Sequence, residues 1–221
     1  MKIFLSILFL STLSFFAVAQ EKMIVDQQYN GNTFYSGFSS SVNSISNLPS
    51  NIQSNISGYF SKILGSMKDG LKFSHGQIVD LEKYFSDNKE TFNYGWVVPK
   101  YDLNFIFQDL SIGIKNYYIQ LRLDEYGQIL ACNWPRVNYS NKNEFKSRSE
   151  IEKFAINEAK IKGITNLEYK VDLKYNLAFD KLCWVFKFPV VLPNNPRKRF
   201  EVFEVDWKSL DIVAQYQIAT Y

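Results

Sequence analysis

Apolar and polar side chains alternate along most of the second half of the chain, as they do in half-buried β-strands. The alternation covers 167–175, 182–188, 200–205 and 212–218. It follows a stretch in which apolar residues recur at three- and four-residue steps, from a Ser149/Glu152 capping box to a stop at Gly163. The second half therefore predicts one helix followed by four antiparallel strands.

The first half shows the same order more faintly. Ser74 and Gln77 have the spacing of a helix cap, and an apolar face follows that ends near Asn88. Alternating segments then cover four ranges, 94–98, 101–107, 119–123 and 129–134. The first half therefore predicts a second helix-and-strand series.

One phrase occurs in both halves, L-R-L-D-E-Y-G-Q-I-L in the first and F-E-V-D-W-K-S-L-D-I-V in the second. Asp124 and Asp206 start the two turns, where a carboxylate can accept hydrogen bonds from backbone N–H groups two residues on. Gly127 tolerates a positive φ in the first turn, and Ser209 stands near that place in a longer second turn. The phrase reads as the last hairpin of a duplicated unit.

These patterns predict an α+β fold of two tandem units, each with one helix packed on an antiparallel β-meander, over 71–140 and 145–221. Residues 20–70 are rich in Ser and Asn, which is typical of a loosely ordered segment. Within them, 50–68 has a weak helical pattern. That helix either lies on a membrane or a partner or packs on the protein's own sheet, and its few cations favour the sheet.

Residues 1–19 have the charge, length and cleavage site of a secretory signal peptide. Lys2 precedes an apolar run over 3–16, and cleavage is predicted after Ala19. The run is shorter than a membrane-spanning helix, and no later stretch is long and apolar enough to span. We expect a periplasmic or secreted mature chain without a transmembrane span.

Composition excludes some partners and leaves the state of the cysteines open. The formal charge of +3 loses one unit when Lys2 leaves, which is far below a nucleic-acid-binding footprint. Aromatic residues make up 17% of the chain and fall mostly in alternating runs, which favours sheet. Cys132 and Cys183 could form one disulfide after export or remain two buried thiols.

Candidate chemistry is sparse. His75 is the only histidine and stands at a predicted helix start, where a surface position is favoured over a catalytic base. No metal site is predicted, because one His and two distant Cys do not make a zinc ligand set. No cofactor motif is present either. Turn and solvent-face roles account for the carboxylates at Glu201, Glu204, Asp206 and Asp211.

The densest basic run is Arg197-Lys198-Arg199, just after Pro196. It is either a solvated hairpin tip or a contact for an acidic partner. Trp207 joins this run as a candidate binding residue, because aromatic side chains are favoured in binding interfaces.

The repeated phrase resembles the closing signature of PepSY and PepSY-like domains, namely an apolar strand, Asp, a short turn with Gly and a second apolar strand. E-I-E-K-F-A-I-N-E-A-K-I-K-G followed by L-C-W-V-F-K-F is similar to that family's helix and central strand. The resemblance covers 74–218 as two copies, better in the second, whose turn departs from the pattern with Ser-Leu-Asp in place of Gly. Tandem copies also resemble the architecture of β-lactamase inhibitor proteins.

This resemblance implies an exported, non-catalytic protein that inhibits a peptidase or binds another exported protein. It supplies no catalytic residues, and we expect no enzyme activity. The alternatives are a secreted hydrolase that uses carboxylates gathered by the fold, and a structural component of the envelope.

Overall fold

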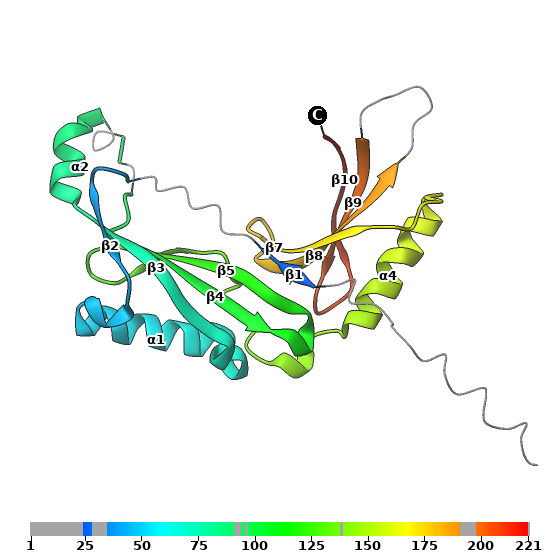
Figure 1. Ribbon diagram of the computed structural model, residues 1–221, viewed down its shortest axis with the longest axis horizontal. Helices are drawn as coiled ribbons and strands as arrows, with labels where there is room; N and C mark the ends of the chain where they lie inside the picture. Colours follow the sequence, from blue (N-terminus) through cyan, green and yellow to red (C-terminus); the bar gives the residue numbers. More distant parts are fainter. Residues whose placement is uncertain are drawn as a thin grey trace, which may run out of the picture.

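The computed structural model describes residues 24–27, 35–90, 94–95, 97–137, 139–190 and 198–220, which form a mixed α+β fold with two sheets (Figure 1). The first sheet has the order β1-β5-β4-β3-β2, with β6 also paired to β5. Its strands are β1 (Val25–Asp26), β2 (Ser39–Val42), β3 (Leu71–Val79), β4 (Tyr101–Asp109), β5 (Ile114–Leu123) and β6 (Ile129–Cys132). All pair antiparallel except β1 with β5.

The second sheet is antiparallel, with the order β10-β9-β8-β7. Its strands are β7 (Lys170–Asn176), β8 (Lys181–Val190), β9 (Lys198–Asp206) and β10 (Ile212–Thr220). The α-helices are α1 (Ser50–Leu64), α2 (Leu81–Asp87) and α4 (Arg148–Ile161), and 3₁₀ turns occupy Ile45–Asn47, Gly65–Gly70, Leu110–Ile112 and Lys142–Glu144. α1 lies across one face of the first sheet and α4 across one face of the second (Figure 1).

The helix predicted over 50–68 is confirmed as α1, which a 3₁₀ turn extends to Gly70. Its buried residues recur at the predicted steps, and the ring of Phe60 meets that of Phe105 in β4 at 4.7 Å. α1 therefore packs on the protein's own sheet. Residues 25–26 and 39–42 form strands, so these parts of the Ser/Asn-rich segment belong to the sheet and are not a loose lead-in.

The helix predicted from Ser74 to Asn88 is wrong over its first half, because β3 occupies 71–79. β3 pairs with β2 on one side and β4 on the other, and these long-range ladders outweigh a weak local helix signal. Only α2 is helical, and it begins where the side chain of Asp80 accepts a hydrogen bond from the backbone N–H of Lys83. The strand predicted over 94–98 is also wrong in its described part, since 94–95 form a turn and 97–98 lie outside any strand.

The helix of the second half is confirmed as α4, but its cap lies two residues earlier than predicted. Ser147 and Glu150 form the capping box, with both reciprocal hydrogen bonds present. Glu152 instead accepts a hydrogen bond from the hydroxyl of Tyr169, in the segment that leads to β7. Two Ser/Glu pairs with the same spacing overlap in this stretch, so the local pattern alone did not distinguish them.

The predicted roles in the first hairpin turn are confirmed. The carboxylate of Asp124 accepts hydrogen bonds from the backbone N–H groups of Tyr126 and Gln128, and Gly127 has a φ of 84°. A Cβ at Gly127 would lie 2.8 Å from Cδ1 of Ile52, so the glycine also lets the turn approach the start of α1.

The second turn uses Asp206 as predicted, since its carboxylate accepts from the backbone N–H of Lys208 at 2.8 Å. The positive φ falls on Leu210, at 63°, and not on Ser209. Trp207 exchanges hydrogen bonds with the backbone of Lys146, just before α4. Each closing turn therefore lies against the start of the helix in its own half.

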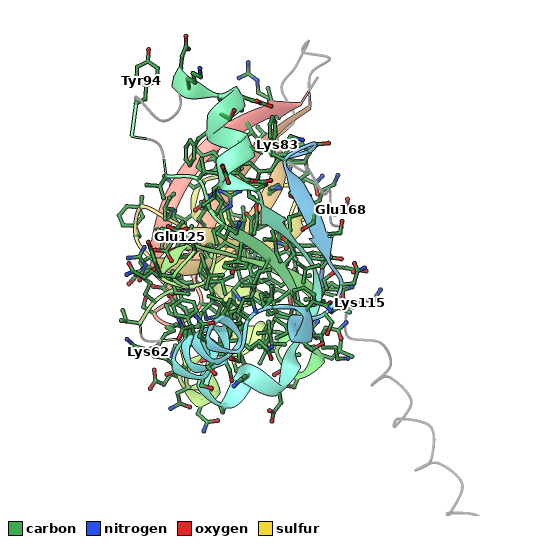
Figure 2. The ribbon with its side chains drawn as sticks, turned by 90° about the vertical axis from the view of Figure 1, so that its left-hand side faces the viewer. Lys62, Lys83, Tyr94, Lys115, Glu125 and Glu168 are labelled. Carbon is green, nitrogen blue, oxygen red and sulfur yellow. The ribbon has the colours of Figure 1, made fainter. Side chains whose placement is uncertain are left out.

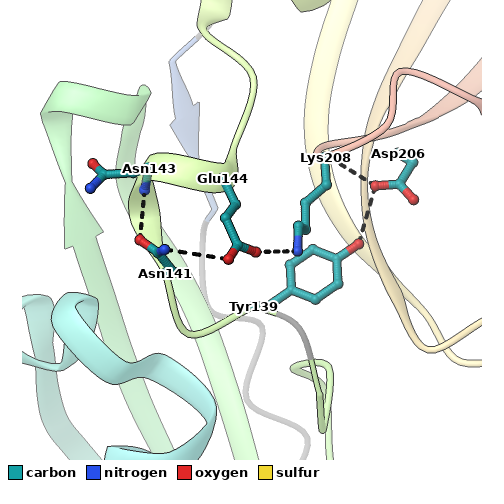
Figure 3. Close-up of polar contacts among 6 residues, drawn as sticks. All are labelled: Tyr139, Asn141, Asn143, Glu144, Asp206 and Lys208. Atoms are coloured by element: carbon teal, nitrogen blue, oxygen red, sulfur yellow. Dashed lines mark hydrogen bonds and ion pairs between the residues drawn. The ribbon is translucent and has the colours of Figure 1, made fainter.

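Side chains also join this turn to the connection between the two sheets (Figure 3). The hydroxyl of Tyr139 donates to Asp206, and the ammonium of Lys208 pairs with Glu144 while lying over the ring of Tyr139. Asn141 donates a further hydrogen bond to Glu144. These contacts tie the connection to the second sheet.

The two halves repeat one order of elements. The first runs α1-β3-α2-β4-β5-β6 and the second α4-β7-β8-β9-β10, and the strands lie in the orders β6-β5-β4-β3 and β10-β9-β8-β7. α1 lies before residue 71, where the first unit is predicted to begin, and the helix inside that predicted unit is α2. β1, β2 and α2 have no counterpart in the described order of the second half.

Candidate functional site

Buried polar side chains mark the face of each sheet that no helix covers, called here the helix-free face. In the described part of the chain, the buried polar and charged residues are Asp102, Asn104, Glu204 and Asp206. Because side chains alternate along a strand, these residues point away from the apolar residues that meet α1 and α4. The helix-free faces therefore hold the fold's buried charge.

Glu204 is 1% exposed and lies in β9. Its carboxylate accepts hydrogen bonds from Lys174 at 3.0 Å, Asn176 at 2.8 Å and the hydroxyl of Tyr216 at 2.9 Å. Desolvation raises its pKa, but these three hydrogen bonds together outweigh it and hold the pKa below its ordinary value. Glu204 is therefore a charged and fully bonded group, which is the opposite of a general acid.

Asp206 repeats this arrangement two residues along β9. Its carboxylate pairs with the ammonium of Lys181 and accepts from the hydroxyl of Tyr139. Desolvation raises its pKa, and the hydrogen bonds from Lys181 and the backbone of Lys208 reverse that shift, so the pKa is lowered overall.

The two cysteines are free thiols, so the candidate disulfide is not formed. Cys132 lies in β6 of the first sheet, and Cys183 lies in β8 of the second, opposite Asp206. Burial raises the pKa of Cys132 to about 11 and that of Cys183 to about 12. Neither has the lowered pKa that nucleophilic or redox cysteines need.

On the helix-free face of the first sheet, Asp102 accepts hydrogen bonds from Gln120 at 2.8 Å and Arg122 at 3.3 Å. His75 lies in β3 opposite Asn104, and not at a helix start as predicted. Its Nδ1 is 2.9 Å from the hydroxyl of Ser74. Desolvation lowers the pKa of His75, and the charge of Asp102 only partly offsets that shift.

A cavity of about 380 Å³ lies where the two sheets meet. The first sheet and its neighbouring loop contribute Gln27, Tyr117 and Asn133, while the helix-free face of the second contributes Lys174, Lys187 and Tyr216. Gln27 bridges the sheets, because its Nε2 donates to the carbonyl of Leu173 and its Oε1 accepts from the N–H of Tyr118. The cavity joins aromatic rings, amides and ammonium groups, which suits binding of a polar surface.

The predicted binding residues do not form one site. Arg197 lies outside the described residues, and Lys198 begins β9. Arg199 is partly buried, and its Nε has no hydrogen-bond partner within the described ranges. Trp207 is 1% exposed and stacks on Phe145 at 4.4 Å, so it is a core residue and cannot be a surface contact.

The described residues contain no group of three or more His, Cys, Asp or Glu side chains that could hold a metal ion. No helix among them has the length and apolar character needed to span a bilayer. The predicted signal peptide lies outside the described residues.

No protein-family model matches the sequence, and no curated protein matches it. Among solved structures, a crystal structure of a "putative lipoprotein" from Clostridium difficile 630 matches with a TM-score of 0.25 and 11% identity. The match covers 62% of this chain and 92% of that chain. A similarity at that level supports no argument about fold or function.

Proposed function

We propose that this chain is an exported, non-catalytic binding protein of two PepSY-like units that holds another exported protein against the helix-free face of its second sheet. The leader-like residues 1–19 support export. The repeated order of elements, with each closing turn against the start of its helix, supports two related units. A peptidase is the class of partner that the family resemblance suggests.

The hydrogen bonds that Glu204 accepts are the main observation in support of a binding role. A carboxylate with three donors and a lowered pKa fixes the surrounding side chains and does not exchange protons near neutral pH. Around it, Lys187 and the 39% exposed Tyr216 present charge and aromatic area on a rigid sheet. Such surfaces are typical of protein interfaces.

Charge reversal on this face tests the proposal. Lys170 and Lys187 lie opposite each other on β7 and β8, and a Lys170→Glu/Lys187→Glu variant changes their sign together. A matched control, Lys62→Glu/Lys153→Glu, makes the same change on α1 and α4, where Lys62 points into solvent (Figure 2). The mature chains are immobilised and exposed to the exported fraction of the native host.

We expect wild type and the helix control to retain the same partner and the sheet variant to lose it. A peptidase among the retained proteins is then assayed with each chain added. Equal retention by all three chains, or no retention by wild type, would contradict the proposal.

A hydrolase is the second candidate, favoured by the contact between Ser74 and His75. To test for a hydrolase, wild type, Ser74→Ala and His75→Ala are assayed with ester and peptide substrates. Hydrolysis by wild type that both variants abolish would replace the binding proposal, because the helix-free face of the first sheet would then hold a nucleophile.

A further inference from the structure

Most sheet edges in the described chain are short, charged or covered. β1, β2 and β6 have only two to four residues each. β7 carries Lys170, Asp172 and Lys174, and Gln27 bonds to the carbonyl of Leu173 in it. These are the usual means by which natural sheets prevent edge-to-edge pairing.

Within the part of the chain that the structure describes, β10 has none of these protections. It spans nine residues, I-V-A-Q-Y-Q-I-A-T, without a charge, proline or glycine, and its register shift lies only at its start. It pairs with β9 and stands at the end of the sheet order (Figure 1). Gln215, Tyr216 and Gln217 in its middle are exposed. An uncharged edge of this length and β-propensity pairs readily with another strand.

We propose that a second copy of this chain covers β10, through antiparallel pairing of the two β10 strands about a two-fold axis at Tyr216. Tyr216 is the midpoint of Ile212–Thr220, so this register pairs the strands over their full length. It sets Gln215 opposite Gln217 and Ala214 opposite Ile218 of the other copy, with no like charges facing. The interface is isologous, and the two second sheets become one continuous sheet.

A second copy is the favoured occupant because the strand complements itself. Amide side chains meet amides on one face, and small and large apolar side chains alternate on the other. This inference does not depend on the proposed function, since it concerns the backbone edge of β10. The two Tyr216 side chains meet at the axis, while Lys170 and Lys187 lie on β7 and β8, away from that edge.

Cysteine cross-linking tests the register. Tyr216→Cys places two thiols opposite each other at the axis, within reach of a disulfide. Ala219→Cys, in the same strand and also exposed, separates its two thiols by six residue steps, or about 20 Å. On mild oxidation we expect a disulfide-linked dimer from Tyr216→Cys and not from Ala219→Cys. Equal cross-linking of the two variants, or of neither, overturns the proposed register.

The oligomeric state tests the contact itself. We expect wild type to sediment at twice the mass of one mature chain. Gln215→Lys/Gln217→Lys sets lysines opposite lysines across the axis and should weaken the dimer at least about tenfold. In the monomer, either lysine can pair with Glu201 on β9, so the fold should persist, which circular dichroism checks.

Ser54→Lys/Ser86→Lys adds the same charge at exposed positions of α1 and α2 and should leave the dimer intact. A wild type that stays monomeric at about 100 µM, or equal dimers from both lysine variants, overturns the proposal.

Discussion

At the scale of single residues, Glu204 links protonation to folding. Its pKa is lowered in the folded chain relative to the ordinary 4.5, so its contribution is complete above that value and is lost as pH falls through the folded pKa. We expect the free energy of unfolding to fall from about pH 5 downward. Glu204→Gln should lower the free energy of unfolding by about 1–3 kcal/mol at neutral pH. The variant should also lose less of that free energy as the pH falls.

Urea denaturation at several pH values, followed by tryptophan fluorescence, measures both effects. Glu168→Gln is the control, because Glu168 is exposed and stands at the outer surface (Figure 2). That variant should stay within about 0.5 kcal/mol of wild type. If Glu204→Gln keeps the full pH dependence of the free energy of unfolding, that dependence arises from other carboxylates.

The thiols make a second prediction at this scale. Because Cys132 and Cys183 are free and burial raises the pKa of each, native protein near pH 8 should react slowly with a thiol reagent. Denatured protein should react at once with two equivalents of the reagent per chain. A reducing agent should leave the melting temperature unchanged, and a fall in that temperature would mean that the cysteines pair in the exported protein.

At the scale of elements, regular alternation predicted the strands well, and the two weak helical patterns had different outcomes: that over 50–68 is confirmed as α1, and that over 74–88 is wrong over its first half. The strands around Trp184 and Phe203 are confirmed because their alternation is regular and their apolar side meets α4. β3 was mistaken for a helix because its sequence carries no clear alternation. Gly76 packs against Leu103 of β4 there, a contact that depends on the partner strand.

The candidate site was largely beyond prediction for the same reason. The fixed charge of Glu204 depends on Lys174 and Asn176 of β7 and on Tyr216 of β10, and local spacing does not reveal these pairings. Trp207 was mistaken for a surface residue because a turn tryptophan carries no signal of burial.

The closing turn of the first half yields a prediction with a matched control. Gly127 and Gly163 both have positive φ, but a Cβ at Gly163 would meet nothing within 4 Å. Gly163→Ala should therefore cost about 1 kcal/mol from backbone strain alone. Gly127→Ala adds clashes with Asn55 and Ile52 of α1 and should cost about 2–4 kcal/mol. Urea denaturation measures both, and equal losses would mean that the turn does not press on α1.

At the scale of the whole molecule, the side chain of Gln27 hydrogen-bonds to both sheets. No pattern in the sequence predicts this link. Gln27 follows β1, and it bonds to β5 of the first sheet and β7 of the second. Loss of its side chain removes the partners of the Tyr118 N–H and the Leu173 carbonyl, both partly buried. Gln27→Ala should therefore lower the free energy of unfolding by about 1–3 kcal/mol.

The same variant should expose the junction without unfolding either sheet. We expect faster amide hydrogen exchange at Tyr118 in Gln27→Ala and unchanged exchange in the centre of β8, where Trp184 lies in the core. Gln128→Ala is the control, since Gln128 is exposed and its side chain has no role in the junction. If the two variants behave alike, the apolar core that runs through both halves holds the sheets together by itself, and Gln27 only fills the edge of β7.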